Sequence, residues 1–408
     1  MLRNKLHRIS DQIGPAPNSE KKIIIPERYQ KAADFLGGEI DSGAGGTFVR
    51  IINDFDADYM HGARRLVDLK GLSGFKKAYF SSGMVDSNEE LRPDKMLFFD
   101  METTGLGGSG TVAFLIGFGS VTDNGFQVRQ YFLPDYPDEE SMLEAVRSEI
   151  DEESIIVSYN GRAFDIPILV DRMIINRVER NLKFAEHIDL LHPVRRFYRR
   201  RLQRCNLTNV EQNILDFHRA DDIPGQLVPA VYFNWLANDD TELLDRVQEH
   251  HLNDIISLYF LMHHLAEIQE APVEKITEPD DILSMVKILE KKREHESISH
   301  ILESLSDLVH HHNRHDILFL HSLAYKRCGR IEKALPIWEY ICTGVSPEAF
   351  LSRIELAKYY EHTVRDFRRA LEEALSAEVI CSMPVWQLQA VRRRIRRLNR
   401  RIAGRAGK

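Results

Sequence analysis

The chain has 408 residues, of which 43% are hydrophobic, and a formal net charge of -8. Such a length exceeds one typical domain, so we expect two or more domains with sizeable cores. The acidic balance argues against a protein that coats nucleic acid or membranes through its bulk charge, although local basic clusters can still bind polyanions.

Cysteine usage and the N-terminal segment bear on the compartment. Cys205, Cys328, Cys342 and Cys381 are scattered, without a CxxC pair or the spacing of a zinc site, which indicates a reducing environment. The opening MLRNKLHRISDQIGPAP has no apolar segment typical of a signal peptide, and no apolar run approaches the roughly 20 residues that span a bilayer. We therefore expect a soluble, cytoplasmic protein without a membrane partner.

Residues 1–90 form an N-terminal extension whose role the sequence does not indicate, although GTFVRII is a possible strand. Three β-type runs follow it: KMLFFDME, TVAFLIGFGSV and FQVRQYFL. The tripeptide Asp123-Asn124-Gly125 predicts a hairpin turn between the second and the third.

Helices and strands then alternate. DEESMLEAVRSEI and FDIPILVDRMIINRV have helical periodicity, and the short buried strand SIIVSYN separates them. KFAEHIDLL predicts a further strand, and LLDRVQEHHLNDIISLYFLMHHLAEI a long helix. The order β-β-β-α-β-α-β-α over residues 91–268 is that of a ribonuclease H-like α/β domain, a mixed sheet flanked by helices.

The C-terminal part is predicted to be helical. Residues 269–281, rich in proline and acid, are typical of a linker. In residues 282–390, Leu-Ala pairs recur 33 residues apart and Ala-Leu pairs 36 apart, which brackets the period of about 34 of tetratricopeptide-type helix pairs. An ordinary helical bundle is the alternative. Residues 391–408 form a basic tail, either a nucleic-acid-binding arm or a frayed helix that balances the acidic body.

Five carboxylates are candidates for a metal site: Asp100 and Glu102 in DMETTGL, Asp165 in YNGRAFD, Asp189 in HIDLL and Asp254 in HHLNDIISL. Each alone has an ordinary explanation, because aspartates often cap turns and helices. Asp100 and Glu102, however, end a strand apolar enough to be central, where unpaired carboxylates are costly without a cation. Together the acids predict an oxygen-ligand set for two hard divalent ions.

A histidine precedes the last of these acids. His250 lies four residues before Asp254, so the two share one face of the predicted helix. Histidine titrates at about 6.5, which suits a base that takes a proton from water at neutral pH. A surface histidine beside His251 is the alternative explanation.

These residues resemble the DEDD superfamily of DnaQ-like exonucleases: FFDMETTGL resembles its first motif, YNGRAFD its second and HHLNDIISL its third. The resemblance is closer to the YprB-like group of ribonuclease H-like proteins, which share the blocks LLHPVRRFYRRRLQRCNLTNVEQNIL and RADDIPGQLVPAVYFNWL. Members of this group often carry tetratricopeptide-like repeats after the nuclease domain. The resemblance is strong over residues 90–268.

The resemblance implies 3'-to-5' exonuclease chemistry with two Mg²⁺ or Mn²⁺ ions. Carried over by position, the metal ligands are Asp100, Glu102, Asp165 and Asp254. Asp100 would bridge both ions, Glu102 would help to orient the attacking water, and His250 would be the general base.

The third motif departs from the family pattern. The histidine branch of the superfamily places its histidine five residues before the last aspartate, where this chain has Glu249. The YprB-like group tends to read His-Asn-x-x-Asp, and the second position here is His251. His251 therefore stays an alternative base.

Two segments are candidates for substrate contact. The resemblance places Thr103, Thr104, Gly105 and Leu106 beside a 3'-terminal nucleotide, where small residues let backbone amides approach phosphate and Leu106 meets a base. A tight turn explains the same residues equally well. Asn160 of the second motif is assigned to the same contact.

The run HPVRRFYRRRLQRC mixes Arg195, Arg196 and Arg199 with Phe197 and Tyr198. Arginines that neutralise phosphates and aromatic rings that stack on bases are typical of single-strand binding. A solvated helix face is the alternative. We therefore expect a two-metal exonuclease acting on a single-stranded 3' end, with a protein partner for the helical repeats; an inactive nucleic-acid-binding or protein-binding scaffold on the same fold is the rival.

Overall fold

The computed structural model describes residues 25–43, 45–69, 75–80, 89–105, 108, 110–179, 181–380 and 384–406. A seven-stranded sheet, in the order β1-β2-β9-β8-β7-β10-β11, forms the centre of its N-terminal part. The strands are β1 (Glu39–Gly43), β2 (Gly46–Asp56), β7 (Met96–Thr103), β8 (Ala113–Thr122), β9 (Gly125–Phe132), β10 (Ile155–Ser158) and β11 (Glu186–Asp189). Neighbours from β1 to β7 are antiparallel, and β7, β10 and β11 are parallel, which confirms the predicted mixed sheet.

The sheet begins inside the predicted N-terminal extension. β2 pairs with β9 from Val49, opposite Phe132, to Asp56, opposite Gly125, and β1 forms the edge. The boundary predicted at residue 91 is therefore too late. Two small hairpins, β3 (Met60–His61) with β4 (Arg64–Arg65) and β5 (Phe75–Lys76) with β6 (Glu90–Leu91), lie between β2 and β7 in the sequence.

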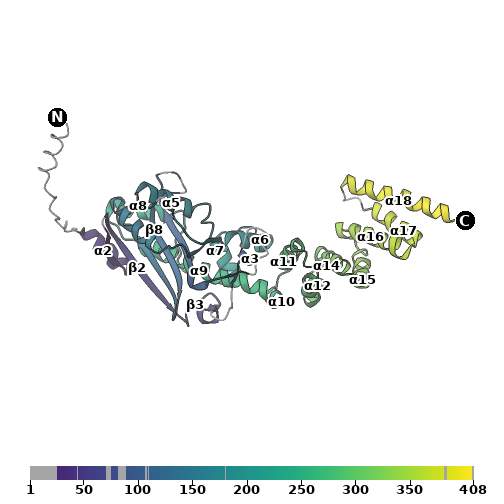
Figure 1. Cartoon of the computed structure of the whole chain (residues 1–408), viewed down its shortest axis with the longest axis horizontal. Coiled ribbons are helices and arrows are strands. Elements are labelled where there is room, and N and C mark those ends of the chain that lie inside the picture. Colours follow the sequence, from purple (N-terminus) through teal and green to yellow (C-terminus); the bar gives the residue numbers. More distant parts are fainter. Residues whose placement is uncertain are drawn as a thin grey trace, which may run out of the picture.

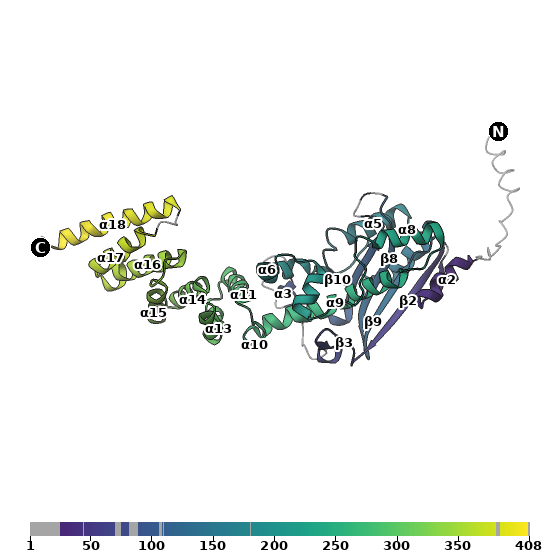
Figure 2. The ribbon, with the colours of Figure 1, turned by 180° about the vertical axis from the view of Figure 1, so that it is seen from behind.

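Helices cover both faces of the sheet (Figures 1 and 2). They are α2 (Glu27–Leu36), α3 (Lys77–Phe80), α4 (Glu139–Ser148), α5 (Asp165–Ile175), α6 (Leu191–Leu202), α7 (Leu207–Val210), α8 (Val228–Asn238) and α9 (Leu244–Glu270). The short helical segments are η1 (Leu66–Leu69), η2 (Pro93–Lys95), η3 (Tyr136–Asp138) and the π-helix η4 (Glu211–Leu215). One core lies among the sheet, α6 and α9, and a second among the sheet, α4, α5 and α8.

Alternation along β7 decides where its acids point. Phe98 belongs to the core beneath α9, and Phe99 to the core on the opposite face. Because side chains alternate with period two, Asp100 and Glu102 follow Phe98 onto the α9 side. The longest helix of the domain therefore passes over both acids.

The C-terminal part is entirely helical. It contains α10 (Pro272–Lys275), α11 (Pro279–Lys292), α12 (His295–Ser304), α13 (Ser306–His311), α14 (His315–Arg327), α15 (Ile331–Ile341), α16 (Pro347–Tyr359), the π-helix η5 (Tyr360–Val364), α17 (Phe367–Glu378) and α18 (Val385–Ala406). From α14 to α18 each helix packs on the next, and this series extends away from the sheet, so α2 and α18 lie at opposite ends of the molecule (Figure 1).

The repeated Leu-Ala and Ala-Leu pairs occupy equivalent places in two helix hairpins, α14/α15 and α16/α17. Their alanines, Ala324, Ala334, Ala357 and Ala370, are all buried, because small side chains allow close helix packing. Tetratricopeptide-type identity itself stays a prediction.

The predicted linker and the predicted basic tail are both largely helical in the structure. The predicted linker, residues 269–281, holds the end of α9, α10 and the start of α11. The predicted tail lies mostly within α18, whose Val391 and Leu398 are buried. No helix in the described part of the chain combines the length and apolar character needed to cross a membrane.

Candidate metal centre

Three elements bring the predicted acids together. β7 carries Asp100 and Glu102, α5 begins at Asp165, and α9 carries His250 and Asp254. Atoms of Glu102, His250 and Asp254 that can bind a metal all lie within 4.8 Å of one another. Asp165 is the first residue of α5, and the cap position before it is Phe164, whose side chain makes no capping hydrogen bond.

Burial and mutual repulsion dominate the electrostatics. Burial raises the pKa of Asp100 well above its usual value, and the carboxylates of Asp254, Asp165 and Glu102 add to the rise. Burial likewise raises the pKa of Glu102 and of Asp165 to about 7, with a contribution from Asp254 in both cases. These shifts mark a place where negative charge is unfavourable unless a cation joins it.

The ring of His250 is held by an acid that sequence reasoning missed. Its Nδ1 lies 2.7 Å from Oδ1 of Asp222. Nη1 of Arg219 also approaches Nδ1, at 3.2 Å, but the contact with Asp222 is shorter, and a carboxylate only accepts hydrogen bonds. Nδ1 therefore carries the hydrogen, and the neutral ring directs the lone pair of Nε2 away from Asp222. Nε2 lies 3.9 Å from Glu102 and 3.7 Å from Asp254. Burial opposes a charge on this ring, but Asp254, Asp222 and Glu102 outweigh it and raise the pKa of His250.

His251 points to the sheet instead and is fully buried. Its Nε2 donates to the backbone oxygen of Asp100 at 3.0 Å, and its Nδ1 accepts from the side-chain amide of Gln130 at 2.9 Å. Burial lowers the pKa of His251 to about 4. Both ring nitrogens are engaged, so the structure favours a positioning role for His251 over the alternative role as the base.

Arg219, another residue that sequence reasoning missed, supplies a buried positive charge to the centre. Its guanidinium donates to Asp254 and binds Glu211 with contacts of 2.6 and 2.8 Å. Side-chain exposure is only 3% for Arg219 and 0% for Glu211. Glu211 begins the π-helix η4 and also accepts from Ser257 of α9. The arginine engages Oδ1 of Asp254, while Oδ2 of that carboxylate faces His250.

The donor set fits hard divalent cations. Carboxylate oxygens are the ligands that Mg²⁺ and Mn²⁺ prefer, and Asp100, Glu102, Asp165 and Asp254 converge here. A single arginine leaves the raised pKa values of three acids in place, so one guanidinium does not balance the cluster.

Comparison with known proteins agrees with this geometry. A family profile described as the RNase_H superfamily matches residues 97–266. The uncharacterized protein YprB of Bacillus subtilis (strain 168) is 34% identical over 287 residues, which cover 69% of this chain and 68% of that protein. The chain belongs to the RNase H superfamily. The mixed sheet and the acid cluster therefore form the RNase H-like domain, and nuclease chemistry and nucleic-acid binding are the functions that this superfamily suggests.

In this RNase H-like domain, Asp189 supports the loop that leads to Asp165. Its carboxylate accepts the backbone amides of Asn160 at 2.8 Å and Leu191 at 3.1 Å. Asn160 has a φ of 66°, a left-handed conformation that asparagine tolerates better than most residues. Asp189 is thus a scaffold for the second motif.

A cleft of about 850 Å³ opens beside this loop. Tyr159 and Asn160 form one part of its wall, and Arg195, Arg199 and Arg204 contribute positive charge. Asn160 is followed by Gly161, where a Cβ would lie 2.9 Å from Oδ2 of Asp165, so this wall of the cleft leads towards that acid. Three of the predicted substrate-binding residues therefore line one cavity.

The aromatic residues of that run do not face the cleft. Phe197 and Tyr198 are buried, and the hydroxyl of Tyr198 lies 2.6 Å from Nε2 of His264, so stacking of these rings on bases was a wrong prediction. Arg196 is half-buried and does not line the cleft. The cause is helical geometry: on α6, Arg195 and Arg199 share one face, and the residues between them turn towards the core.

The loop after Glu102 is held by its own threonines. Thr103 donates to the backbone oxygen of Gly105 at 2.7 Å, and the hydroxyl of Thr104 accepts the amide of Val112 at 3.0 Å. These bonds support the tight-turn explanation and leave substrate contact as a prediction. Leu106 lies outside the described residues.

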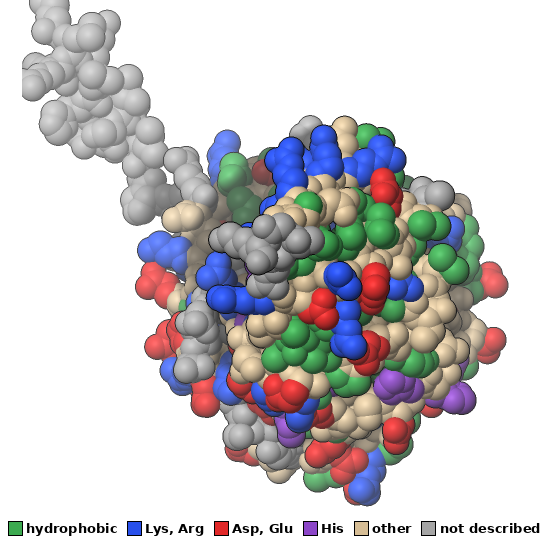
Figure 3. Space-filling model, turned by 90° about the vertical axis from the view of Figure 1, so that its right-hand side faces the viewer, with side chains coloured by type: hydrophobic (Ala, Val, Ile, Leu, Met, Phe, Trp, Pro, Cys, Tyr) green, Lys and Arg blue, Asp and Glu red, His purple; other side chains and the backbone are tan. Residues whose placement is uncertain are grey.

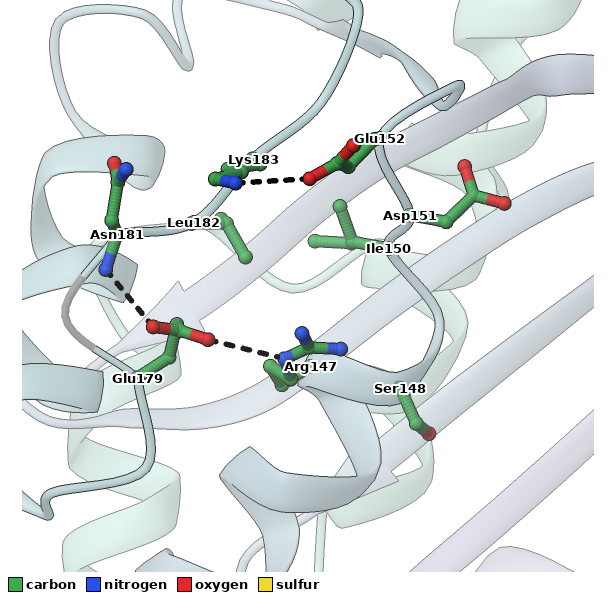
Figure 4. Close-up of a pocket in the computed structure, with 9 residues that line it drawn as sticks. All are labelled: Arg147, Ser148, Ile150, Asp151, Glu152, Glu179, Asn181, Leu182 and Lys183. Atoms are coloured by element: carbon green, nitrogen blue, oxygen red, sulfur yellow. Dashed lines mark hydrogen bonds and ion pairs between the residues drawn. The ribbon is translucent and has the colours of Figure 1, made fainter.

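A second cleft, of about 470 Å³, lies near the amino ends of β10 and β11 (Figure 4). Residues before β10 and β11 line it, whereas Asp100 and Glu102 lie in the carboxyl-terminal half of β7 and Asp165 follows β10. Its charges pair with each other, Lys183 with Glu152 at 3.0 Å and Arg147 with Glu179 at 3.5 Å (Figure 4). We assign it no part in the RNase H-like chemistry.

Proposed function

We propose that the chain is a metal-dependent exonuclease that hydrolyses phosphodiester bonds of nucleic acid from the 3' end. The observation that carries this proposal is the convergence of Glu102, His250 and Asp254 within 4.8 Å beside Asp100 and Asp165, in a domain of the RNase H superfamily. A scaffold has no physical need for buried carboxylates that repel one another.

Asp100, Glu102, Asp165 and Asp254 would hold two Mg²⁺ or Mn²⁺ ions. When bound, such ions lower the pKa of water and stabilise the charge on the leaving oxygen. Arg219 keeps one oxygen of Asp254 engaged, so the carboxylate presents its other oxygen to the centre. Besides holding metal, Glu102 would help to orient the attacking water, since its carboxylate lies 3.9 Å from Nε2 of His250.

His250 acts as the general base. Its Nε2 takes the proton of the attacking water, and Asp222 stabilises the resulting imidazolium through Nδ1. This arrangement requires a ring that keeps one tautomer and one orientation, and the 2.7 Å contact with Asp222 supplies both. His251 instead fixes the backbone at Asp100 and stays uncharged at neutral pH.

The substrate strand enters along the arginine-lined cleft. Arg195 and Arg199 bind its phosphates, Asn160 contacts it nearer to the acids, and Thr103, Thr104, Gly105 and Leu106 adjoin the terminal nucleotide. Guanidinium groups suit this task because they form charge-assisted hydrogen bonds with phosphate. The groups along this path would contact the sugar-phosphate backbone of the nucleic acid rather than the edges of its bases. This favours binding of a single strand without sequence preference.

The alternative is an inactive scaffold on the same fold. Only a measurement of hydrolysis distinguishes it from the proposed exonuclease. We would incubate the purified full chain with 5'-labelled single-stranded DNA and RNA in Mg²⁺, Mn²⁺ or chelator. We expect metal-dependent ladders that shorten from the 3' end, lost in Asp100→Asn and retained in Asp245→Asn, an exposed aspartate of α9.

Internal fragments without a ladder would contradict the exonuclease direction. Binding of either oligonucleotide without cleavage in any metal would establish the scaffold instead. We propose separately that the helical repeats bind a protein partner. To test this, we would compare the partners captured by the full chain with those captured by a full chain altered within residues 282–390.

A further inference from the structure

Helix α18 carries an unusual concentration of charge at the far end of the molecule from the sheet (Figure 1). Between residues 392 and 406 it has eight arginines and no acidic residue. Figure 3 faces this end and shows lysine and arginine side chains gathered along the upper edge, where α18 lies. The chain as a whole is acidic, so this charge is local and directional.

One side of α18 is fixed to the helical domain. Val391 and Leu398 are buried, and Arg394, Arg397 and Arg401 all pair with Glu361 of the π-helix η5. Three cations around one carboxylate leave net positive charge even on this side. These contacts fix the orientation of α18 about its own axis, so the opposite face of the helix is exposed to solvent.

That opposite face carries Trp386, Arg393, Arg396 and Arg400. The three arginines are exposed and have no ion-pair partner among the residues that the structure describes. Trp386 is 66% exposed, which is rare for the largest apolar side chain. At 3.6 residues per turn, the four residues fall within an arc of roughly 80° and extend over about 21 Å. We call this surface the Trp-Arg face.

We propose that the Trp-Arg face binds single-stranded nucleic acid. Guanidinium groups in a row neutralise successive phosphates, and an exposed indole offers a platform on which a base stacks whatever its identity. Both features lie on one rigid helix, so a strand that follows the arginines brings a base to Trp386. Arginines that bind phosphate and an indole that stacks on any base do not distinguish sequences, so we expect little sequence preference.

The pattern fits a polyanionic strand better than a membrane surface. An interfacial helix inserts an apolar face along its length into lipid. On α18 the exposed large apolar side chains are Val385 and Trp386 in the first turn, whereas Val391 and Leu398 pack inside the protein. The exposed positions from Arg392 to Arg400 are arginine and asparagine. Charge and one aromatic ring are therefore what this surface offers a partner.

This binding site is independent of the acid cluster and of the proposed hydrolysis. The test measures the affinity of the full chain for a fluorescent single-stranded oligonucleotide, in chelator, over a series of salt concentrations. A triple variant, Arg393→Ala with Arg396→Ala and Arg400→Ala, should weaken binding and reduce the slope of log affinity against log salt by about 2, because each phosphate contact contributes about 0.7 on single strands.

The single change Trp386→Ala should lower affinity about tenfold, the size of one stacking contact, and Trp386→Phe should restore most of it. The matched control removes three exposed lysines of α11, as Lys287→Ala with Lys291→Ala and Lys292→Ala, at the same cost in charge. We expect its salt slope to equal that of the wild type.

Equal affinity and equal slope for the α18 triple variant and the α11 control would overturn the proposal. So would a triple variant that loses binding to phosphatidylserine vesicles while it retains the oligonucleotide. Because turnover plays no part in the measurement, a chain that fails to cleave nucleic acid can still pass this test, and the two proposals fail separately.

Discussion

Single residues of this centre differ in role although they are neighbours in sequence. His250 and His251 are adjacent on α9, about 100° apart around the helix, and so one faces the acids and the other faces β8. Asp222 holds the first ring, while Gln130 and the backbone of Asp100 hold the second. Chemistry and support are thus divided between consecutive residues.

Opposite outcomes are expected for the two histidines. His250→Ala should lower kcat by about 10²- to 10⁴-fold with little change in stability, because it removes a base. His251→Ala should cost about 2–4 kcal/mol of unfolding free energy, because it leaves a cavity and removes the buried hydrogen bonds to Gln130 and to the backbone oxygen of Asp100. Single-turnover kinetics and urea denaturation measure the two effects. A His251→Ala protein of full stability and no activity would reverse the assignment.

Arg219 should be the residue whose loss damages the centre most. Arg219→Met leaves Glu211 and part of Asp254 buried without a cation, which costs about 3–5 kcal/mol. Urea denaturation of the variant measures this cost. The matched control is Arg246→Met, whose exposed ion pair with Glu249 should contribute less than about 1 kcal/mol. Equal costs for the two variants would contradict the buried network.

At the scale of elements, the approach of α9 to the sheet positions the centre. β8 presents Gly117 opposite Asp100 of β7, and the helix lies so close there that a Cβ on Gly117 would be 2.5 Å from Cε1 of His251 and 2.4 Å from Cδ1 of Ile255. A glycine at this strand position therefore sets the distance between His251 and the acid-bearing strand.

Gly117→Ala should push α9 away from the sheet. We expect a loss of about 1–3 kcal/mol from overpacking, together with lower turnover because His251 loses its bond to Asp100. Thermal unfolding and oligonucleotide hydrolysis measure these effects. Gly225→Ala is the control, since a Cβ at Gly225 meets no atom within 4 Å. A stable, fully active Gly117→Ala protein would show that the helix spacing is not limiting.

At the scale of the whole molecule, the RNase H-like domain and the helical series form one continuous chain of packed elements. α11 contacts α6 of the domain, and the helices from α14 onward pack in sequence order towards α18. The acid centre and the Trp-Arg face thus occupy different ends of one elongated body (Figure 2). A long single strand of nucleic acid is the kind of ligand that could reach from the acid centre to the Trp-Arg face.

Global stability should report on the acid cluster through pH and metal. The pKa values of Glu102 and Asp165, about 7 when folded, exceed their unfolded values, so the folded state keeps protons that the unfolded state has lost. In chelator this stabilisation is fully present below the unfolded pKa values of about 4 and is lost as pH rises from about 4 through 7.

At about pH 8, Mn²⁺ should restore the free energy of unfolding. A Mn²⁺ concentration of 100 times its Kd should add about 2.7 kcal/mol. Melting temperatures across pH, with and without the metal, test this expectation. Glu102→Gln should flatten the pH dependence and reduce the metal effect. If Mn²⁺ stabilised wild type and Glu102→Gln alike, Glu102 would not be a metal ligand.

Local pattern alone predicted most of the secondary structure and the convergence of the acids. The alternation of Phe98 and Phe99 directs the next acids to one side, and a helix that begins at Asp165 after a buried strand returns that acid to the same edge of the sheet. These features depend on a few neighbouring residues, whose periodicity the sequence displays. The sheet starts earlier than predicted, in β1 and β2. GTFVRII was predicted as a possible strand, but its place in this sheet was missed because it depends on pairing with a distant partner, β9.

Contacts between distant segments decided the rest. Arg219 and Asp222 meet Asp254 and His250 only because the chain between α7 and α8 folds back over α9, and no spacing in the sequence announces that contact. Likewise, the burial of Phe197 and Tyr198, and the attachment of α18 through Glu361, follow from which face of a helix finds a partner. The sequence by itself determined the elements and the chemistry they carry, whereas tertiary packing selected the side chains that reach the site, because burial and charge pairing act between residues far apart along the chain.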